Sequence, residues 1–296
     1  MGEDENRNAA LFQGKVAIVT GAAQGLGRAY VQALLDRGAY VVASDLGTDR
    51  VGSAADDSVI VEAARTLRAR EGQLITHSGR LDHEAGCRQL VDLAIAQFGA
   101  LDILIHNAGW VGYQAIDAQE EAFLERALGI HVRAPIWLSK YAWAHLQRSL
   151  SARIVLTTSD RALYPQYAQP GLTAYAAGKM AQVGIMHALS MEGAPHGILV
   201  NAVSPVAKTR MWGIDGEPDE LHPDAVAAGV AFLVSGRCRE GGWVLRASNG
   251  QFHALRLQEA ENVAYPRDLR AVLADSIESV ALQWPVIARP SVDARG

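Results

Sequence analysis

Tyr175 and Lys179 stand four residues apart in the segment Tyr175-Ala-Ala-Gly-Lys179. In a helix this spacing places both side chains on one face, about one turn apart. A phenol has an ordinary pKa of about 10, and a neighbouring ammonium lowers that pKa because it favours the phenolate. The pair therefore predicts a catalytic proton acceptor and donor, with Tyr175 as the acid/base and Lys179 as its partner.

Ser159 is a second candidate catalytic residue, because it follows directly on the expected strand at 152–157. Ligands of open parallel sheets bind at the carboxyl ends of the strands. A hydroxyl at this position can hydrogen-bond the oxygen of a substrate, although a serine that only forms a turn is the plainer alternative.

A glycine-rich turn lies between the first expected strand and the first expected helix, in Thr20-Gly21-Ala22-Ala23-Gln24-Gly25-Leu26-Gly27. A diphosphate needs backbone N–H groups at close range and a helix N-terminus that points at it. Glycine permits both the tight turn and the close approach. The turn predicts a dinucleotide site formed by Gly21, Ala23, Gln24, Gly25, Leu26 and Gly27.

Asp45 follows the second expected strand, with Leu46 beside it. A carboxylate at this position accepts hydrogen bonds from the hydroxyls of the adenosine ribose and repels a 2′-phosphate. Neither Gln24 nor Leu46 is basic, so neither would attract that phosphate. The sequence therefore favours NAD over NADP.

These residues need a scaffold of alternating strands and helices. Apolar, β-branched segments predict strands at 16–20, 40–43, 74–76, 101–105, 152–157, 198–203 and 242–245. Helical spacing predicts helices at 30–35, 59–70, 87–98, 120–146 with an interruption at 129–135, 173–192 and 226–234. We expect an α/β fold, a single Rossmann-like doubly wound domain with a seven-stranded, mainly parallel sheet and helices on both faces.

The domain organisation follows from this pattern. Residues 1–10 are polar and predict a mobile tail, and residues 11–250 form the expected catalytic domain. Residues 251–296 form a C-terminal extension with one amphipathic helix at 269–282 and a proline-containing tail.

Composition excludes some classes of partner. The net charge is −5, which disfavours electrostatic binding of nucleic acid. No apolar run reaches the roughly 18 residues of a membrane-spanning helix, and no signal peptide is evident. Cys87 and Cys238 match no metal-binding spacing. We expect a cytoplasmic enzyme without a metal.

With these motifs in order, the sequence resembles the short-chain dehydrogenase/reductase family over about Gly14 to Val244. The resemblance rests on the glycine turn, Asn107-Ala108-Gly109, Ser159 and Tyr175 with Lys179. The surroundings are similar to the hydroxyacyl-CoA dehydrogenase unit of peroxisomal multifunctional enzymes. The segments concerned are Ser44-Asp45-Leu46-Gly47, His131-Val132-Arg133, Ser190-Met191-Glu192-Gly193 and Thr209-Arg210-Met211.

The resemblance implies further cofactor contacts. Asn107, Ala108 and Gly109 would line the adenosine and ribose end, Pro205 and Val206 would flank the nicotinamide, and Thr209 would touch the nicotinamide or the diphosphate. It also implies a homo-oligomer, either a dimer or a tetramer.

Three departures from the family pattern stand out. His131 occupies the place of an asparagine that holds a water in a proton relay, and it is either a relay member or a structural residue. The segment from Ser159 to Tyr175 is a few residues longer than usual. Gly79 stands where an aspartate commonly contacts adenine.

Bulky residues on the loops expected near the catalytic groups predict a hydrophobic substrate. They are Trp110, Tyr113, Tyr164, Tyr167, Met211 and Trp212. We expect a hydrophobic secondary alcohol or its ketone, although about half of these residues could only pack the loops together. The alternatives are a 3-hydroxyacyl-CoA dehydrogenase, an NAD-retaining epimerase or lyase, and an NAD-binding module without catalysis.

Overall fold

The computed structural model describes residues 11–49, 52, 55–209, 218–259 and 262–288. Its centre is an eight-stranded sheet with the order β3-β2-β1-β4-β5-β6-β7-β8. The strands are β1 (Val16–Thr20), β2 (Tyr40–Ser44), β3 (Leu74–His77), β4 (Ile103–His106), β5 (Arg153–Thr157), β6 (Leu199–Val206), β7 (Val244–Ser248) and β8 (Gln251–Leu255). All neighbouring pairs from β3 to β7 are parallel, which confirms the expected doubly wound α/β fold.

The eighth strand corrects the expected count of seven. β8 pairs with β7 antiparallel, and Asn249 and Gly250 connect the two strands with positive φ angles of 48° and 74°. Two such residues in succession suit a tight hairpin turn. The side chains of β8 are mostly exposed, so the strand lacks the apolar run that marks a buried strand. The compact unit therefore extends past the expected boundary at 250 to Leu255.

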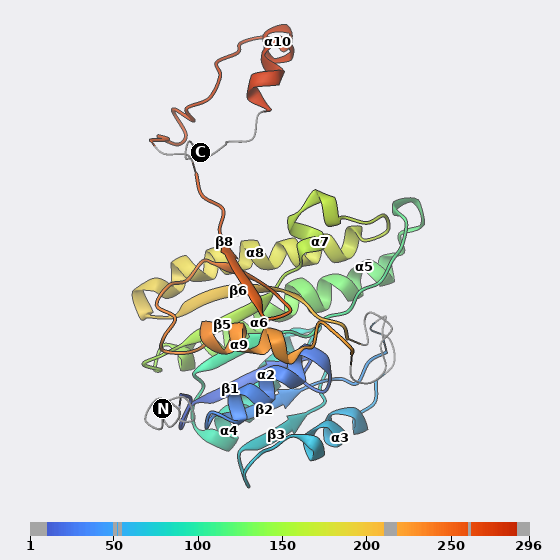
Figure 1. Cartoon of the computed structure of the whole chain (residues 1–296), viewed down its shortest axis with the longest axis vertical. Helices are drawn as coiled ribbons and strands as arrows, with labels where there is room; N and C mark the ends of the chain where they lie inside the picture. The colour runs from blue at the N-terminus through green and yellow to red at the C-terminus, as the bar shows by residue number, and fades with distance from the viewer. Residues whose placement is uncertain (1–10, 50–51, 53–54, 210–217, 260–261, 289–296) are drawn as a thin grey trace. The chain divides into compact units, whose positions relative to one another are not determined.

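Helices cover both faces of the sheet (Figure 1). One face packs against α2 (Gly25–Leu35), α3 (Ser58–Thr66) and α9 (Asp224–Leu233). The other packs against α4 (Glu84–Phe98), α6 (Ala134–Leu146) and α8 (Thr173–Gly193). α5 (Glu121–Leu128) leads through the π-helical turn η2 (Gly129–Arg133) into α6, so the interruption expected near 129–135 is present.

Successive residues of the central strands face opposite layers. In β1, Ala17 and Val19 belong to the core under α2 and α9, whereas Val16 and Ile18 belong to the core under α4, α6 and α8. All four are fully or almost fully buried. A strand that is apolar on both faces suits a parallel sheet covered on both sides, and it holds the carboxyl edge of the sheet rigid.

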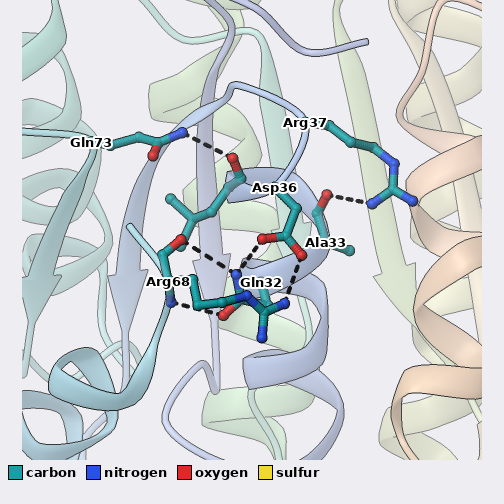
Figure 2. A network of polar contacts seen from close by, with 7 residues as sticks. Gln32, Ala33, Asp36, Arg37, Arg68 and Gln73 are labelled. Atoms are coloured by element: carbon teal, nitrogen blue, oxygen red, sulfur yellow. Dashed lines mark hydrogen bonds and ion pairs between the residues drawn. The ribbon is translucent and has the colours of Figure 1, made fainter. Parts of the chain in front are cut away.

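A polar network fastens the end of α2 to the segment that leads into β3 (Figure 2). Gln32 donates to Asp36 at 2.7 Å, and Arg68 pairs with Asp36 at 2.9 Å. Gln73 donates to the carbonyls of Leu35 and Ala39 at 3.0 and 2.8 Å. These contacts link α2, which begins at the glycine turn, to the strands beside it.

Residues 256–288 form a second, separate unit as far as they are described. Its helix α10 is Ile277–Ile287, so the helix expected at 269–282 begins later and ends later. Ser276 accepts a hydrogen bond from the N–H of Ser279, and the Ser279 hydroxyl accepts from the N–H of Ser276. This reciprocal cap fixes the start of the helix at Ile277.

Two further features concern possible partners. Among the described residues, no helix combines the length and the apolar character that crossing a membrane requires. The same part of the chain contains no group of three or more His, Cys, Asp or Glu side chains arranged to hold a metal ion.

Candidate active site

The glycine turn joins β1 to α2 at the carboxyl edge of the sheet. A Cβ atom at Gly27 would lie 1.9 Å from the carbonyl oxygen of Gly21, so α2 can approach the turn only with glycine there. Gly25 has a φ of +50°, and a Cβ on it would lie 2.9 Å from Cγ2 of Thr209. The turn is therefore a tight cradle, with Thr209 on its far side, as a diphosphate site requires.

Asp45 is fixed beside this turn. Its carboxylate accepts hydrogen bonds from the N–H groups of Ala23 at 2.9 Å and Gly47 at 2.8 Å. Both oxygens keep free lone pairs, because a carboxylate has about four acceptor positions. Asp45 is thus held where it can also accept from the hydroxyls of a ribose.

A cavity of about 600 Å³ runs along the turn and the adjoining strand ends. Among the residues predicted to bind the cofactor, its walls include Gly21, Ala23, Gln24, Gly25, Leu26, Asp45, Leu46, Asn107, Ala108, Gly109 and Thr209. Gly27 packs behind the turn, and Pro205 and Val206 end β6 without lining this cavity. The size and the polar edges of the cavity fit a dinucleotide, and Asp45 fits the ribose of NAD.

His106 organises this edge of the sheet, and sequence reasoning missed it. Its Nε2 lies 3.0 Å from the carbonyl oxygen of Ile130 and its Nδ1 lies 3.1 Å from Oγ1 of Thr20. Because a carbonyl only accepts, Nε2 carries the hydrogen and Nδ1 accepts from Thr20. The Thr20 oxygen in turn accepts from the N–H groups of Asn107 and Ala108. Burial lowers the pKa of His106 to about 3, so the imidazole is neutral.

Ser159, Tyr175 and Lys179 come together at the end of β5. The hydroxyl of Ser159 is near enough to the phenol of Tyr175 for hydrogen bonding to lower the pKa of that phenol. The ammonium nitrogen of Lys179 lies 5.8 Å from the centre of the Tyr175 ring, and it donates to the carbonyl of Thr157 at 2.8 Å. The long segment between Ser159 and Tyr175 folds as α7 (Asp160–Leu163) and η3 (Pro165–Tyr167), so its extra length does not separate the two hydroxyls.

Burial changes the expected pKa of Tyr175. Its pKa is raised above the ordinary value, because burial outweighs the lowering by the Ser159 hydrogen bond and the Arg161 charge. The net pKa of Tyr175 in the free enzyme is thus raised, whereas its spacing to Lys179 predicts a lowered one. Burial without a carboxylate partner lowers the pKa of Lys179 itself to about 7.

His131 lies in the π-helical turn, next to the candidate catalytic groups. It is fully buried, and its ring meets the Tyr175 ring edge-on at 5.6 Å. Nε2 lies 3.1 Å from the carbonyl of Trp110, so Nε2 donates, while the buried Nδ1 has no hydrogen-bond partner. A Cβ on Gly109 would lie 3.1 Å from Nδ1 and 3.4 Å from the ammonium nitrogen of Lys179. Burial holds the pKa of His131 well below its usual range.

A second polar cluster, also missed from the sequence, anchors the residue after Ser159. Asp160 accepts from the Ser204 hydroxyl at 2.6 Å and from Nη2 of Arg246 at 2.7 Å. Ser204 and Arg246 are direct neighbours across β6 and β7. The Arg246 guanidinium stacks on the ring of Tyr164 at 4.6 Å. This cluster ties the catalytic loop to two strand ends.

The residues predicted to form the substrate pocket separate into distinct groups. Trp110 is buried and packs on Phe123 and Arg126, and it lines the cofactor cavity. Tyr164 and Tyr167 pack edge to face with each other. Tyr113 is half-exposed and donates to Gln169 at 3.0 Å. Met211 and Trp212 lie outside the described residues.

Comparison with known proteins agrees with this geometry. Residues 15–217 match a family model described as short chain dehydrogenase. Peroxisomal multifunctional enzyme type 2 from Mus musculus is 31% identical over 255 residues, which are 83% of this chain and 33% of the mouse enzyme. This chain therefore spans only about a third of that relative's length.

Solved structures are similar over most of the chain. A short chain dehydrogenase from Mycobacterium avium superposes with a TM-score of 0.77 at 26% identity, covering 95% of this chain and 97% of that chain. A 3-ketoacyl-(acyl-carrier-protein) reductase from Brucella melitensis, complexed with NADH, superposes with a TM-score of 0.69 at 27% identity, covering 79% and 97%. Together with the family match, these likenesses show that the chain belongs to the short-chain dehydrogenase family of oxidoreductases, which act on CH–OH groups.

Proposed function

We propose that this protein is an NAD(H)-dependent oxidoreductase that interconverts a hydrophobic secondary alcohol and its ketone. The observation that carries the proposal is the buried group of Ser159, Tyr175 and Lys179 at the sheet edge that also holds the glycine turn. Asp45 supports NAD over NADP, because a carboxylate held by Ala23 and Gly47 would repel a 2′-phosphate.

The roles of the residues follow from their atoms. The chemistry that bound NAD(H) supplies is hydride transfer to or from the carbinol carbon. In the oxidative direction Ser159 holds the alcohol oxygen and Tyr175 takes its proton. Arg161 and the Ser159 hydrogen bond oppose the effect of burial on the pKa of Tyr175. Lys179 binds the nicotinamide ribose, and its positive charge stabilises the phenolate when the site is loaded.

His131 supports a proton relay behind Lys179. Its Nδ1 is a buried acceptor without a partner, and it lies on the same side of Gly109 as the Lys179 ammonium. A neutral imidazole with Nε2–H fixed on the Trp110 carbonyl presents Nδ1 as a permanent acceptor. We assign to this nitrogen the role of a hydrogen-bond acceptor that positions the relay beside Lys179 without taking up the proton itself.

A second candidate function is oxidation of a 3-hydroxyacyl thioester. It is favoured by the likeness to the Brucella protein, which is named a 3-ketoacyl-(acyl-carrier-protein) reductase. The same three catalytic residues serve this reaction, because the reacting group is again a secondary carbinol. An epimerase or lyase that retains NAD uses the same site without releasing NADH.

The test is to supply NAD⁺ with a panel of hydrophobic secondary alcohols and 3-hydroxyacyl-CoA thioesters, and to follow NADH in solution. We expect net NADH formation, and a loss of roughly 10²–10⁴-fold in kcat for Tyr175→Phe with unchanged NADH binding by fluorescence titration. Tyr141→Phe is the matched control, because that hydroxyl bonds the surface residue Glu84. Near-wild-type turnover by Tyr175→Phe contradicts the proposal, and bound NAD without net reduction supports the epimerase.

A further inference from the structure

Arg161 lies two residues after Ser159, between the two loops that border the catalytic hydroxyls. Its N–H donates to the Ser159 hydroxyl at 3.3 Å, and its guanidinium donates to the Tyr113 hydroxyl at 2.8 Å. Tyr113 in turn donates to Gln169 at 3.0 Å, and the N–H of Gln114 donates to the carbonyl of Gly171 at 2.9 Å. These bonds link the loop after β4 to the loop before α8, and Arg161 is held where the two loops meet.

Among the described residues, Arg161 has no carboxylate as an ion-pair partner. The neighbouring Asp160 accepts from Arg246 and Ser204, so its carboxylate is already occupied in another cluster. Within the described part of the chain, no carboxylate comes within ion-pairing distance of Arg161, and its side-chain partner is the neutral phenol of Tyr113. A guanidinium has five N–H donors, and the described residues take up one of them, through the Tyr113 hydroxyl.

Arg161 is also electrostatically coupled to the reacting hydroxyl. Its charge lowers the pKa of Tyr175, against the larger effect of burial. Geometry places it in the same region, because the backbone N–H of Arg161 bonds the Ser159 hydroxyl, which is the group that would hold the substrate oxygen.

We propose that Arg161, held by Tyr113, is an anion subsite for the substrate, and that the substrate carries a carboxylate close to its carbinol. A guanidinium fork fits a carboxylate with two parallel hydrogen bonds. With the apolar loops around the site, this makes the preferred substrate an amphipathic hydroxy acid rather than a neutral alcohol. The inference rests on the proposed oxidation of a secondary carbinol and narrows its substrate class.

The experiment compares probes that differ only in charge. The first pair is 3-hydroxyoctanoate and its methyl ester, and the second is mandelate and its methyl ester, each supplied with NAD⁺. The readout is the ratio of kcat/KM for the acid to kcat/KM for its ester. Because one catalytic base serves both members of a pair, the effect of Arg161 on the pKa of Tyr175 cancels in this ratio.

Three variants separate charge from structure. Arg161→Gln removes the cation, Arg161→Lys keeps the charge without the fork, and Tyr113→Phe removes the hydroxyl that holds Arg161. Arg148→Gln is the matched control, since Arg148 follows α6 at the opposite edge of the sheet and its side chain bonds His145. Arg148→Gln changes the net charge of the protein by the same amount as Arg161→Gln.

We expect the wild type to favour at least one acid over its ester. Arg161→Gln should lower that ratio about 10- to 100-fold, as for a hydrogen bond to a charged group. Arg161→Lys and Tyr113→Phe should give intermediate ratios, and Arg148→Gln should match the wild type. Added salt should lower the ratio in every protein that keeps a cation at position 161 and leave that of Arg161→Gln nearly unchanged. Equal ratios in the wild type and Arg161→Gln would overturn the anion subsite and leave the proposed oxidation standing. Absence of NADH from all four probes would overturn both.

Discussion

The ammonium of Lys179 lies beside the ring of Tyr175, 5.8 Å from its centre, and donates its hydrogen bond to the carbonyl of Thr157 instead of the phenol. The backbone of Lys179 is held as well, because the Thr158 hydroxyl donates to its carbonyl at 2.8 Å. Lys179 is thus fastened at both ends to the segment that ends β5. A buried cation with only a neutral carbonyl as its partner costs folding free energy.

Lys179→Met should stabilise the protein while it abolishes turnover. The pKa of Lys179 is about 7 when folded, below its unfolded value, so the unfolded chain binds more protons between those two values. The wild type should therefore gain stability as pH rises from about 7 to about 10, with a maximum slope of about 1.4 kcal/mol per pH unit.

Denaturant unfolding at several pH values measures this effect. The methionine variant should lose the Lys179 contribution to the slope and should exceed the wild type most clearly below pH 7. Lys140→Met, on an exposed lysine paired with Glu84, is the control. A Lys179→Met protein that is less stable than the wild type at pH 6 contradicts the pKa assigned to this side chain.

Asp45→Asn should shift the cofactor preference toward NADP. The amide removes the negative charge that would repel a 2′-phosphate, and it keeps an acceptor oxygen for one of the two N–H groups, that of Ala23 or that of Gly47. We expect the NADP/NAD ratio of kcat/KM to rise about 10- to 100-fold, as for loss of one charge-assisted hydrogen bond and of the repulsion. Asp36→Asn, in the polar network at the end of α2, is the control. An unchanged ratio removes Asp45 from the ribose site.

His131→Leu and His131→Asn should behave differently if Nδ1 serves the relay as a hydrogen-bond acceptor. Leucine removes both the bond to the Trp110 carbonyl and the acceptor, whereas asparagine keeps a donor and an acceptor. We expect kcat to fall about 100-fold for leucine and less than about 10-fold for asparagine, with KM for NAD⁺ nearly unchanged. Equal losses in both variants, or a loss confined to KM, would assign His131 a packing role.

Arg246→Met should weaken both the fold and catalysis. It leaves the partly buried carboxylate of Asp160 with the Ser204 hydroxyl as its remaining side-chain partner. We expect a loss of about 1–3 kcal/mol in unfolding free energy and a fall in kcat, because Ser159 is no longer held. The double variant Arg246→Met/Asp160→Asn should recover part of the stability. Thermal unfolding measures the loss of stability, and kcat measured at one temperature tests the effect on catalysis. An Arg246→Met variant that is active and fully stable contradicts a role of Arg246 in positioning Ser159.

Local sequence motifs predicted where most residues of the candidate site lie in the structure. The glycine turn, Asp45 and the Tyr175–Lys179 spacing depend on short stretches of chain, whose geometry follows from glycine freedom and helix periodicity. The parallel sheet was predictable for a similar reason, since strands buried on both faces must be apolar throughout. By contrast, β8 was missed because its exposed side chains give no apolar run.

The sequence by itself determined which residues stand at the carboxyl edge and in what order. Only the tertiary structure decided their electrostatics, because burial and distant partners set a pKa. Burial raises the pKa of Tyr175 and lowers that of Lys179, against the expectation from their spacing. His106 and Arg246 acquire roles only when β4, β6 and β7 bring them to Thr20 and Asp160. Such contacts join residues far apart in the chain, so no local pattern encodes them.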